Sequence, residues 1–200
     1  MDFSFIFGLL SGFIAIFAYG FYFKQILAGQ STPNPASWGI WLTAGVLNAI
    51  TYFAVTEGNI WQSMIVLAVA FSTGLIFVYS LFRGKFTRVS TVEIIALVLA
   101  LAIGIFWQLT SDDRLSNLFL QGVYIISFIP TIIGIASGKA RENHVSWSVV
   151  FVAYVFAALS VAFGSHPDWV AFVNPLVNGV LCTGIVIALI LYKNHHERVT

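Results

Sequence analysis

Uncharged polar side chains within long apolar stretches are the residues of this sequence best placed to do chemistry. Hydroxyl and carboxamide groups donate and accept hydrogen bonds, and burying them in hydrocarbon without partners is costly. Such groups near the middle of membrane-spanning segments are typical of a solute-binding site. The residues predicted to contact a neutral polar solute are Asn48, Thr73, Tyr124, Tyr154, Asn174 and Asn178.

Asparagine is the most informative of these residue types. Asn174 and Asn178 are four residues apart, so a helix places them on one face. Each amide offers two donors and an acceptor, which match the hydroxyls or amides of a solute without burying a charge. The alternative is that Asn48 and Asn178 only bond one membrane helix to another, and that Thr73 bonds its own backbone.

Two prolines fall inside apolar stretches, at Pro130 and Pro175. Each removes a backbone hydrogen bond from its helix, and the resulting bend can serve as a hinge or gate. A static kink is the alternative, because proline kinks are common in membrane helices.

Charged and metal-binding groups are missing from the middle of these stretches. Glu93 lies close to one end of its stretch, and the four histidines fall in loops or in the C-terminal tail. This pattern gives no sign of a carboxylate proton relay and favours facilitated diffusion. No metal-ligand cluster, nucleophile motif or phosphate loop is found, so we expect neither a cofactor nor an enzyme.

The stretches that carry these residues indicate an all-α integral membrane protein. Hydrophobic residues make up 59% of the 200 residues and charged residues 8%, against about 25% charged in soluble domains. About 20 apolar residues cross a bilayer as a helix. Seven such helices are predicted, at residues 3–23, 37–56, 59–82, 91–110, 114–137, 146–164 and 168–192.

Basic residues divide unequally between the two sides of this seven-helix arrangement. Eight fall on one side and only Arg114 on the other, so the positive-inside rule predicts an N-terminus outside and a C-terminus in the cytosol. The eight are Lys24, Arg83, Lys85, Arg88, Lys139, Arg141, Lys193 and Arg198.

A ten-residue pattern, G-x-x-x-x-N-x-x-S-W, occurs at residues 29–38 and again at 138–147, an offset of 109. It predicts two parallel three-helix bundles, residues 1–90 and 114–200, joined by a linker helix within 91–113. Ser37 and Ser146 are predicted N-caps, and Trp38 and Trp147 are predicted interfacial anchors and not ligand contacts.

This three-plus-one-plus-three arrangement resembles the SWEET and PQ-loop (MtN3-like) superfamily of small-solute transporters. Pro130-Thr131 stands where the family has Pro-Gln, and residues 139–146 are similar to its Lys-x-x-Glu-Gly-x-Ser with one residue inserted. The first copy has Phe21-Tyr22 instead, and the second and sixth spans lack the family's prolines. The resemblance implies a facilitative carrier of a sugar-like solute, held by Asn178 at a central site between the repeats.

Two other functions fit a similar seven-helix body. One is a vitamin-nucleoside carrier resembling the nicotinamide riboside transporters, whose aromatic side chains would correspond to residues such as Trp41 and Trp61. The other is a KDEL-receptor-like peptide receptor, which needs Arg or Lys in its cavity. The expected partners are a small-molecule solute and the lipid bilayer, with no nucleic acid, and the chain could also form a homo-oligomer.

Overall fold

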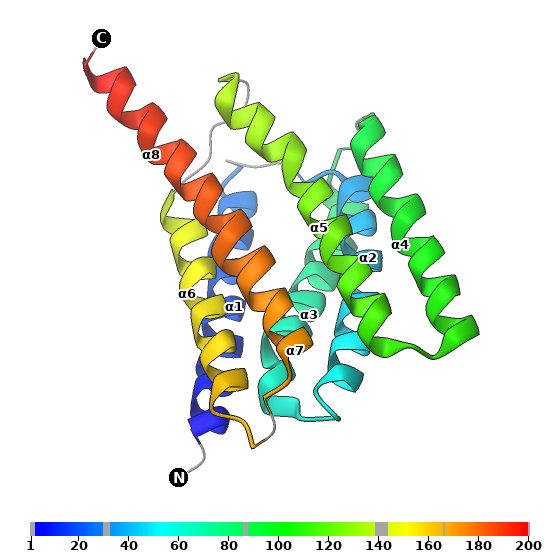
Figure 1. Ribbon diagram of the computed structural model, residues 1–200. Helices are drawn as coiled ribbons and strands as arrows, with labels where there is room; N and C mark the ends of the chain where they lie inside the picture. The colour runs from blue at the N-terminus through cyan, green and yellow to red at the C-terminus, as the bar shows by residue number, and fades with distance from the viewer. Residues whose placement is uncertain (1–2, 30–32, 86–87, 139–143, 166, 200) are drawn as a thin grey trace.

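The computed structural model describes residues 3–29, 33–85, 88–138, 144–165 and 167–199, and this part of the chain consists of helices and short connections without strands (Figure 1). It contains seven helical spans that are long and apolar enough to cross a membrane. The predicted all-α, seven-span membrane fold is therefore confirmed. Residues 139–143, part of the segment compared above with the Lys-x-x-Glu-Gly-x-Ser motif, lie outside the described residues.

Six spans are single α-helices, whereas the seventh consists of three consecutive pieces. The helix bounds are α1 Phe3–Leu27, α2 Pro35–Val55, α3 Ile60–Arg83, α4 Thr91–Thr110, α5 Asp113–Ala136, α6 His144–Ala162, α7 Trp169–Val173, the π-helix η1 Asn174–Cys182 and α8 Thr183–Val199.

The helix ends keep the offset of 109 that the sequence repeat shows. Pro35 begins α2 and His144 begins α6, while Gly29 and Gly138, just beyond α1 and α5, have φ of 71° and 75°. Glycine adopts this left-handed conformation without steric strain, which explains why both copies end these helices with it. The two copies therefore share local geometry at these helix ends as well as sequence.

The N-cap of α2 is Asn34, so the prediction that Ser37 caps this helix is wrong. The Asn34 side chain accepts a hydrogen bond from the Ala36 amide at 3.2 Å, and Pro35 supplies a φ already suited to the first helical position. Ser37 lies in the first turn, where its hydroxyl accepts from the Asn34 side chain at 3.1 Å. Ser146 likewise lies inside α6 and does not cap it, and Asn143, the position equivalent to Asn34, is outside the described residues.

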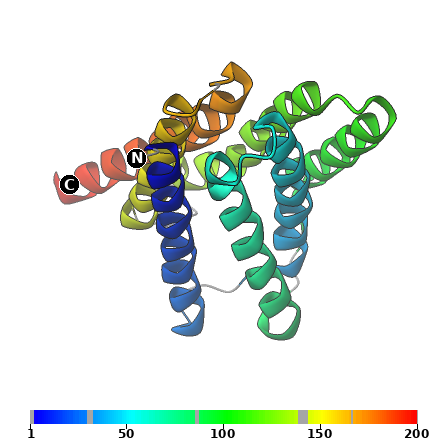
Figure 2. The same cartoon turned by 90° about the horizontal axis from the view of Figure 1, so that it is seen from below.

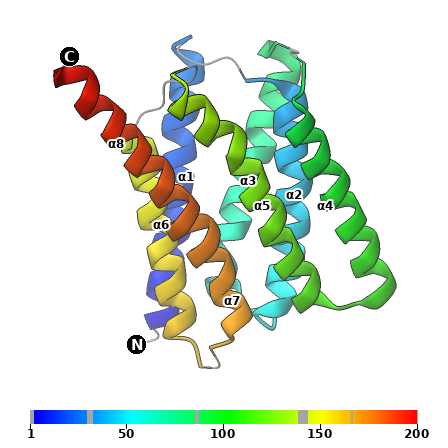
Figure 3. The same ribbon diagram turned by 45° about the horizontal axis from the view of Figure 1, so that its top comes forward.

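Helices of the two halves pack in the same order. In the first half α1 and α2 each pack against α3, and in the second half α5 and α6 each pack against the last span. Between the halves, α1 packs against α6 and α2 against α5, a reciprocal pairing. Helix α4 packs against α2 and α5 and lies at the periphery of the molecule (Figures 2 and 3).

The last span changes its winding at Asn174, one residue before Pro175. Proline has no amide hydrogen to donate, and π turns often occur where the regular ladder is interrupted. The Thr183 hydroxyl donates to the carbonyl of Asn178 at 3.0 Å, five residues earlier. Pro130 lies within α5, and its side chain is outside the described part; hinge motion at either proline stays a prediction.

Candidate functional site: a central cavity and a carboxamide cluster

A cavity of about 360 Å³ lies between the two halves, bounded by α1, α2, α3, α5, α6 and the last span. Its lining extends from Asn178 and Thr183 in the last span to Ser37 and Ser146 in the first turns of α2 and α6. The wall consists of Ala18, Tyr19, Tyr22, Gln25, Ser37, Trp38, Trp41, Gly45, Val69, Thr73, Tyr124, Ser127, Phe128, Thr131, Ser146, Trp147, Val150, Tyr154, Asn178 and Thr183.

The two ends of the molecule carry different charges. The end that the cavity approaches, called here the basic end, carries Lys24, Arg83, Lys85, Arg88 and Lys193 among the described residues, with Glu93 as its one described carboxylate side chain in a helical span. The acidic end carries Glu57, Asp112, Asp113 and Asp168. The cavity wall itself contains no Asp, Glu, Lys, Arg or His within the described ranges. It is therefore suited to an uncharged occupant.

Most of the cavity wall is built from equivalent positions of the repeat. Sixteen of the twenty wall residues form eight pairs separated by 109 positions. The cavity is thus centred between equivalent surfaces of the two halves. The pairs are Ala18 and Ser127, Tyr19 and Phe128, Tyr22 and Thr131, Ser37 and Ser146, Trp38 and Trp147, Trp41 and Val150, Gly45 and Tyr154, and Val69 and Asn178.

Aromatic rings form a continuous row along one side of the wall. Trp41 stacks on Tyr124 with ring centroids 6.0 Å apart, and Phe128 links Trp41 to Trp147 at 6.4 and 6.0 Å. The structure thus places the Trp residues of both repeated motifs on the cavity wall, which the assignment as interfacial anchors did not predict. Such a wall can hold a flat or amphipathic solute by ring contact.

A cluster of five buried carboxamides joins α2, α5 and the last span. Asn48 Oδ1 accepts from Gln121 Nε2 at 3.0 Å, from Asn117 Nδ2 at 3.1 Å and from Asn174 Nδ2 at 3.3 Å. Gln121 Oε1 accepts in turn from Asn174 Nδ2 at 3.3 Å and from Asn178 Nδ2. The amides therefore satisfy most of one another's hydrogen-bonding groups within the membrane region.

The predicted site residues divide between these two features. Thr73, Tyr124, Tyr154 and Asn178 lie on the cavity wall. Asn48 and Asn174 belong to the carboxamide cluster and do not contribute to the wall, because their amides are turned toward Gln121. Solute contact by the four wall residues stays a prediction.

The sequence analysis missed Asn117 and Gln121, which are both nearly fully buried. Their spacing of four residues places them on one face of an apolar helix, the same signal that identified Asn174 and Asn178. They were overlooked because both fall in the first third of the predicted span, away from its midpoint. The carboxamide cluster lies at the level of this first third of α5, nearer the acidic end.

Beyond the cluster, the acidic end is closed by direct contacts between helices. The Tyr52 hydroxyl donates to the Ala171 carbonyl at 2.8 Å, and the hydroxyls of Ser4 and Ser160 each donate to the other's carbonyl at 2.8 Å. Near the surface, Arg114 forms an ion pair with Asp168 of the last span. These contacts leave the basic end as the open side of the cavity.

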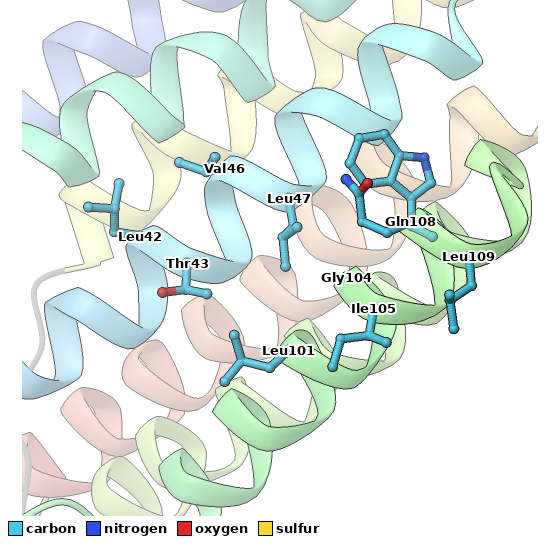
Figure 4. A pocket seen from close by; sticks show the side chains of 10 residues that line it. Leu42, Thr43, Val46, Leu47, Leu101, Gly104, Ile105, Gln108 and Leu109 are labelled. Carbon is cyan, nitrogen blue, oxygen red and sulfur yellow. The ribbon is translucent and has the colours of Figure 1, made fainter.

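A second hollow, of about 600 Å³, lies between α2 and α4 (Figure 4). Its lining is mainly aliphatic, and the Thr43 hydroxyl is already bonded to the Gly39 carbonyl at 2.9 Å. Leu109 beside it is 81% exposed, as expected of a surface that faces lipid. Although larger, this groove offers few polar groups for recognising a solute.

Comparisons with family models, curated proteins and solved structures found no match for this chain. The function is therefore argued from the cavity and the cluster alone.

Proposed function

We propose that this protein is a facilitative carrier of a small neutral polar solute, which binds in the central cavity beside Asn178. The observation that carries the proposal is the uncharged cavity lined by eight equivalent pairs from the two halves. In transporters built from repeats, the binding site lies between the repeats and access alternates when one moves against the other.

The closed acidic end supports this mechanism. Its contacts are short hydrogen bonds such as that between Tyr52 and the Ala171 carbonyl, which can break and re-form without moving a charge through the membrane. Because α1–α6 and α2–α5 are equivalent interfaces, a rocking motion of one half can close the basic end while it opens the acidic end.

The chemistry of the wall argues for passive transport. Asn178, Ser127 and Thr73 offer hydrogen bonds but cannot carry a proton across the cavity at neutral pH. Uptake should therefore follow the solute gradient and persist when a pH gradient is dissipated.

The aromatic row favours a second candidate, a carrier of nucleoside-like solutes. Trp41 and Tyr124 are stacked with an interplanar angle of 27° and could contact a flat base, while the nearby amide and hydroxyls bond its polar edge. A peptide receptor of the KDEL type is less well supported, since the described cavity wall has no Arg or Lys to bind a carboxylate.

Uptake into proteoliposomes tests the carrier function directly. The purified chain is first screened by thermal shift against sugars, nucleosides, amino acids and short peptides, because a ligand of the native state raises its stability. Solutes that stabilise the protein should then enter vesicles down their gradient. Uptake that collapses when the pH gradient is dissipated would contradict facilitated diffusion.

We also propose that the basic end faces the cytosol. A cysteine introduced at Gln30 should react with an impermeant maleimide only from the cytosolic side, and one at Ser165 only from outside. Both substitutions use a background in which Cys182, the single native cysteine, is replaced by alanine. The reverse pattern would overturn the orientation without affecting the seven-span fold.

A further inference from the structure

The orientation of one buried amide, that of Gln121, is determined by a backbone carbonyl. Gln121 Nε2 lies 3.0 Å from the carbonyl oxygen of Asn117, one turn earlier in α5. A carbonyl oxygen only accepts hydrogen bonds, so the nitrogen and not the oxygen of the Gln121 amide must face it. The ambiguity that usually attends side-chain amides is thereby removed at this position.

This orientation directs Gln121 Oε1 toward the last span. The oxygen accepts from the Nδ2 atoms of Asn174 and Asn178, so both asparagines turn their nitrogens toward Gln121. Their Oδ1 atoms consequently point elsewhere. Both oxygens are buried and have no hydrogen-bond partner in the described part of the chain.

Of the two asparagines, Asn178 is the one on the cavity wall, where the residue is 4% exposed. A buried acceptor without a partner is costly, and a hydroxyl or N–H group of a bound solute can satisfy it. A hydrogen-bond acceptor of the solute in the same place would face the Asn178 oxygen, and neither acceptor would have a donor.

We propose that Asn178 Oδ1 selects a hydrogen-bond donor on the solute, and that Gln121 is the positioning residue that sets this polarity. The inference rests on the proposed carrier function and deepens it. It identifies the solute class as molecules with a hydroxyl or N–H group at the end that enters the cavity first.

Binding of matched solutes tests the polarity. Purified protein is titrated by thermal shift with D-glucose, D-xylose, myo-inositol, uridine and adenosine, and then with analogues of each stabilising solute in which fluorine replaces one hydroxyl at a time. Fluorine cannot donate, so one analogue should lose roughly 5- to 150-fold in affinity. In Asn178→Leu that difference between parent and analogue should disappear.

The role of Gln121 is tested by the same ratio of affinities. Gln121→Met keeps the length of the side chain but removes the acceptor, so the Asn178 amide can rotate. The ratio of the affinity of the parent solute to that of its fluorinated analogue should then fall toward one. Ser116→Ala is the matched control, because Ser116 is buried on the same helix and its hydroxyl has no partner in the described structure. Should Gln121→Met fail to fold, the ratio in Asn178→Leu still decides the polarity.

The possible results separate the inference from the carrier function. If solutes bind and every fluorinated analogue binds within about twofold of its parent, the polarity is wrong and the carrier function stands. If Gln121→Met binds normally with its donor preference intact, Gln121 is not the positioning residue. If no solute of the panel shifts the melting temperature, both the inference and the proposed carrier of neutral polar solutes are overturned.

Discussion

At the contact between α2 and α3 Gly45 faces Ala70, whereas at the equivalent contact of the second half Tyr154 faces Gly179. A Cβ added to Gly45 would lie 3.9 Å from the Ala70 Cα, but one added to Gly179 would lie 2.1 Å from the Tyr154 Cβ. Both partners are small at the first contact, whereas a tyrosine packs directly against a glycine at the second. Equivalent helices can therefore keep the same packing order although the second contact accommodates the Tyr154 side chain and the first has no tyrosine at the equivalent position.

The two halves also differ in the helix that carries the deepest part of the wall. Val69 of α3 occupies the position equivalent to Asn178, and α3 is a regular helix whereas the last span contains η1 and Pro175. At this pair of equivalent positions, a polar side chain is present on the cavity wall in the second half only. The following substitutions test these differences, from the largest expected effect to the smallest.

The asymmetry of recognition is tested by substituting the equivalent residues Asn178 and Val69. Asn178→Leu removes the polar contact with the solute and should reduce uptake into proteoliposomes by roughly 5- to 150-fold. Val69→Ala removes only apolar contact and should leave uptake within about twofold. Equal losses in the two variants, with correct insertion of both, would show that Asn178 has no special role.

The difference between these two helix contacts is tested by two glycine substitutions. Gly179→Ala forces the last span away from Tyr154 and should destabilise the protein by about 1–3 kcal/mol. A Cβ at Gly45 makes only ordinary van der Waals contacts, so Gly45→Ala should be neutral or stabilising by about 0.5–1 kcal/mol, since alanine is the better helix former. Thermal unfolding in detergent measures both, and changes of the same sign would refute the comparison.

One of the hydrogen bonds that close the acidic end has no counterpart at the equivalent position of the second half. Tyr52 bonds the Ala171 carbonyl across the two halves, while the equivalent residue of the second half is Val161, which has no hydroxyl. Tyr52→Phe should lower the unfolding free energy by about 0.5–1.5 kcal/mol. Tyr79→Phe is the control, because Tyr79 packs its ring against Phe23 in the same half. A Tyr52→Phe protein as stable as the control would mean that this bond does not hold the end closed.

The smallest effect is expected where the halves differ by a surface charge. Asp168 caps the last span by accepting from the Val170 amide at 2.9 Å, and its counterpart Asn59 caps α3 by accepting from the Trp61 amide at 3.0 Å. Asp168→Asn keeps a cap but loses the ion pair with the exposed Arg114, at a cost of about 0–1 kcal/mol. Asp168→Ala also loses the cap and should cost about 1 kcal/mol more. Equal melting temperatures for the two variants would contradict a role in capping.

Local signals in the sequence were enough to predict the helices and the repeat. Apolar length is a property of each segment alone, so all seven spans were found, with ends that differ by a few residues. The largest mismatch is at the end of the last span, which was predicted to end at residue 192 but continues to Val199. Two other mismatches are smaller. The first span continues to Leu27, and the second begins at Pro35 because Asn34 and not Ser37 provides the cap.

The candidate site was predicted only in part. Helical spacing showed that Asn174 and Asn178 share a face, but not that Asn174 is used by the cluster while Asn178 also reaches the cavity. Asn48 was expected on the wall, yet its oxygen is occupied by three amide donors from other helices. Whether an asparagine belongs to the cluster or to the cavity wall depends on which helix faces pack together. That packing is determined by residues distant in the sequence.

The sequence by itself determined the seven spans, the offset of 109 between the two halves and the absence of charge from their middle parts, because each depends on residue type and short-range spacing. Only the tertiary structure decided that Trp38 and Trp147 line one cavity, and that the Asn117 carbonyl orients Gln121 and through it Asn178. The physical reason is that hydrogen-bond polarity and cavity shape arise from contacts between helices, which no single segment specifies.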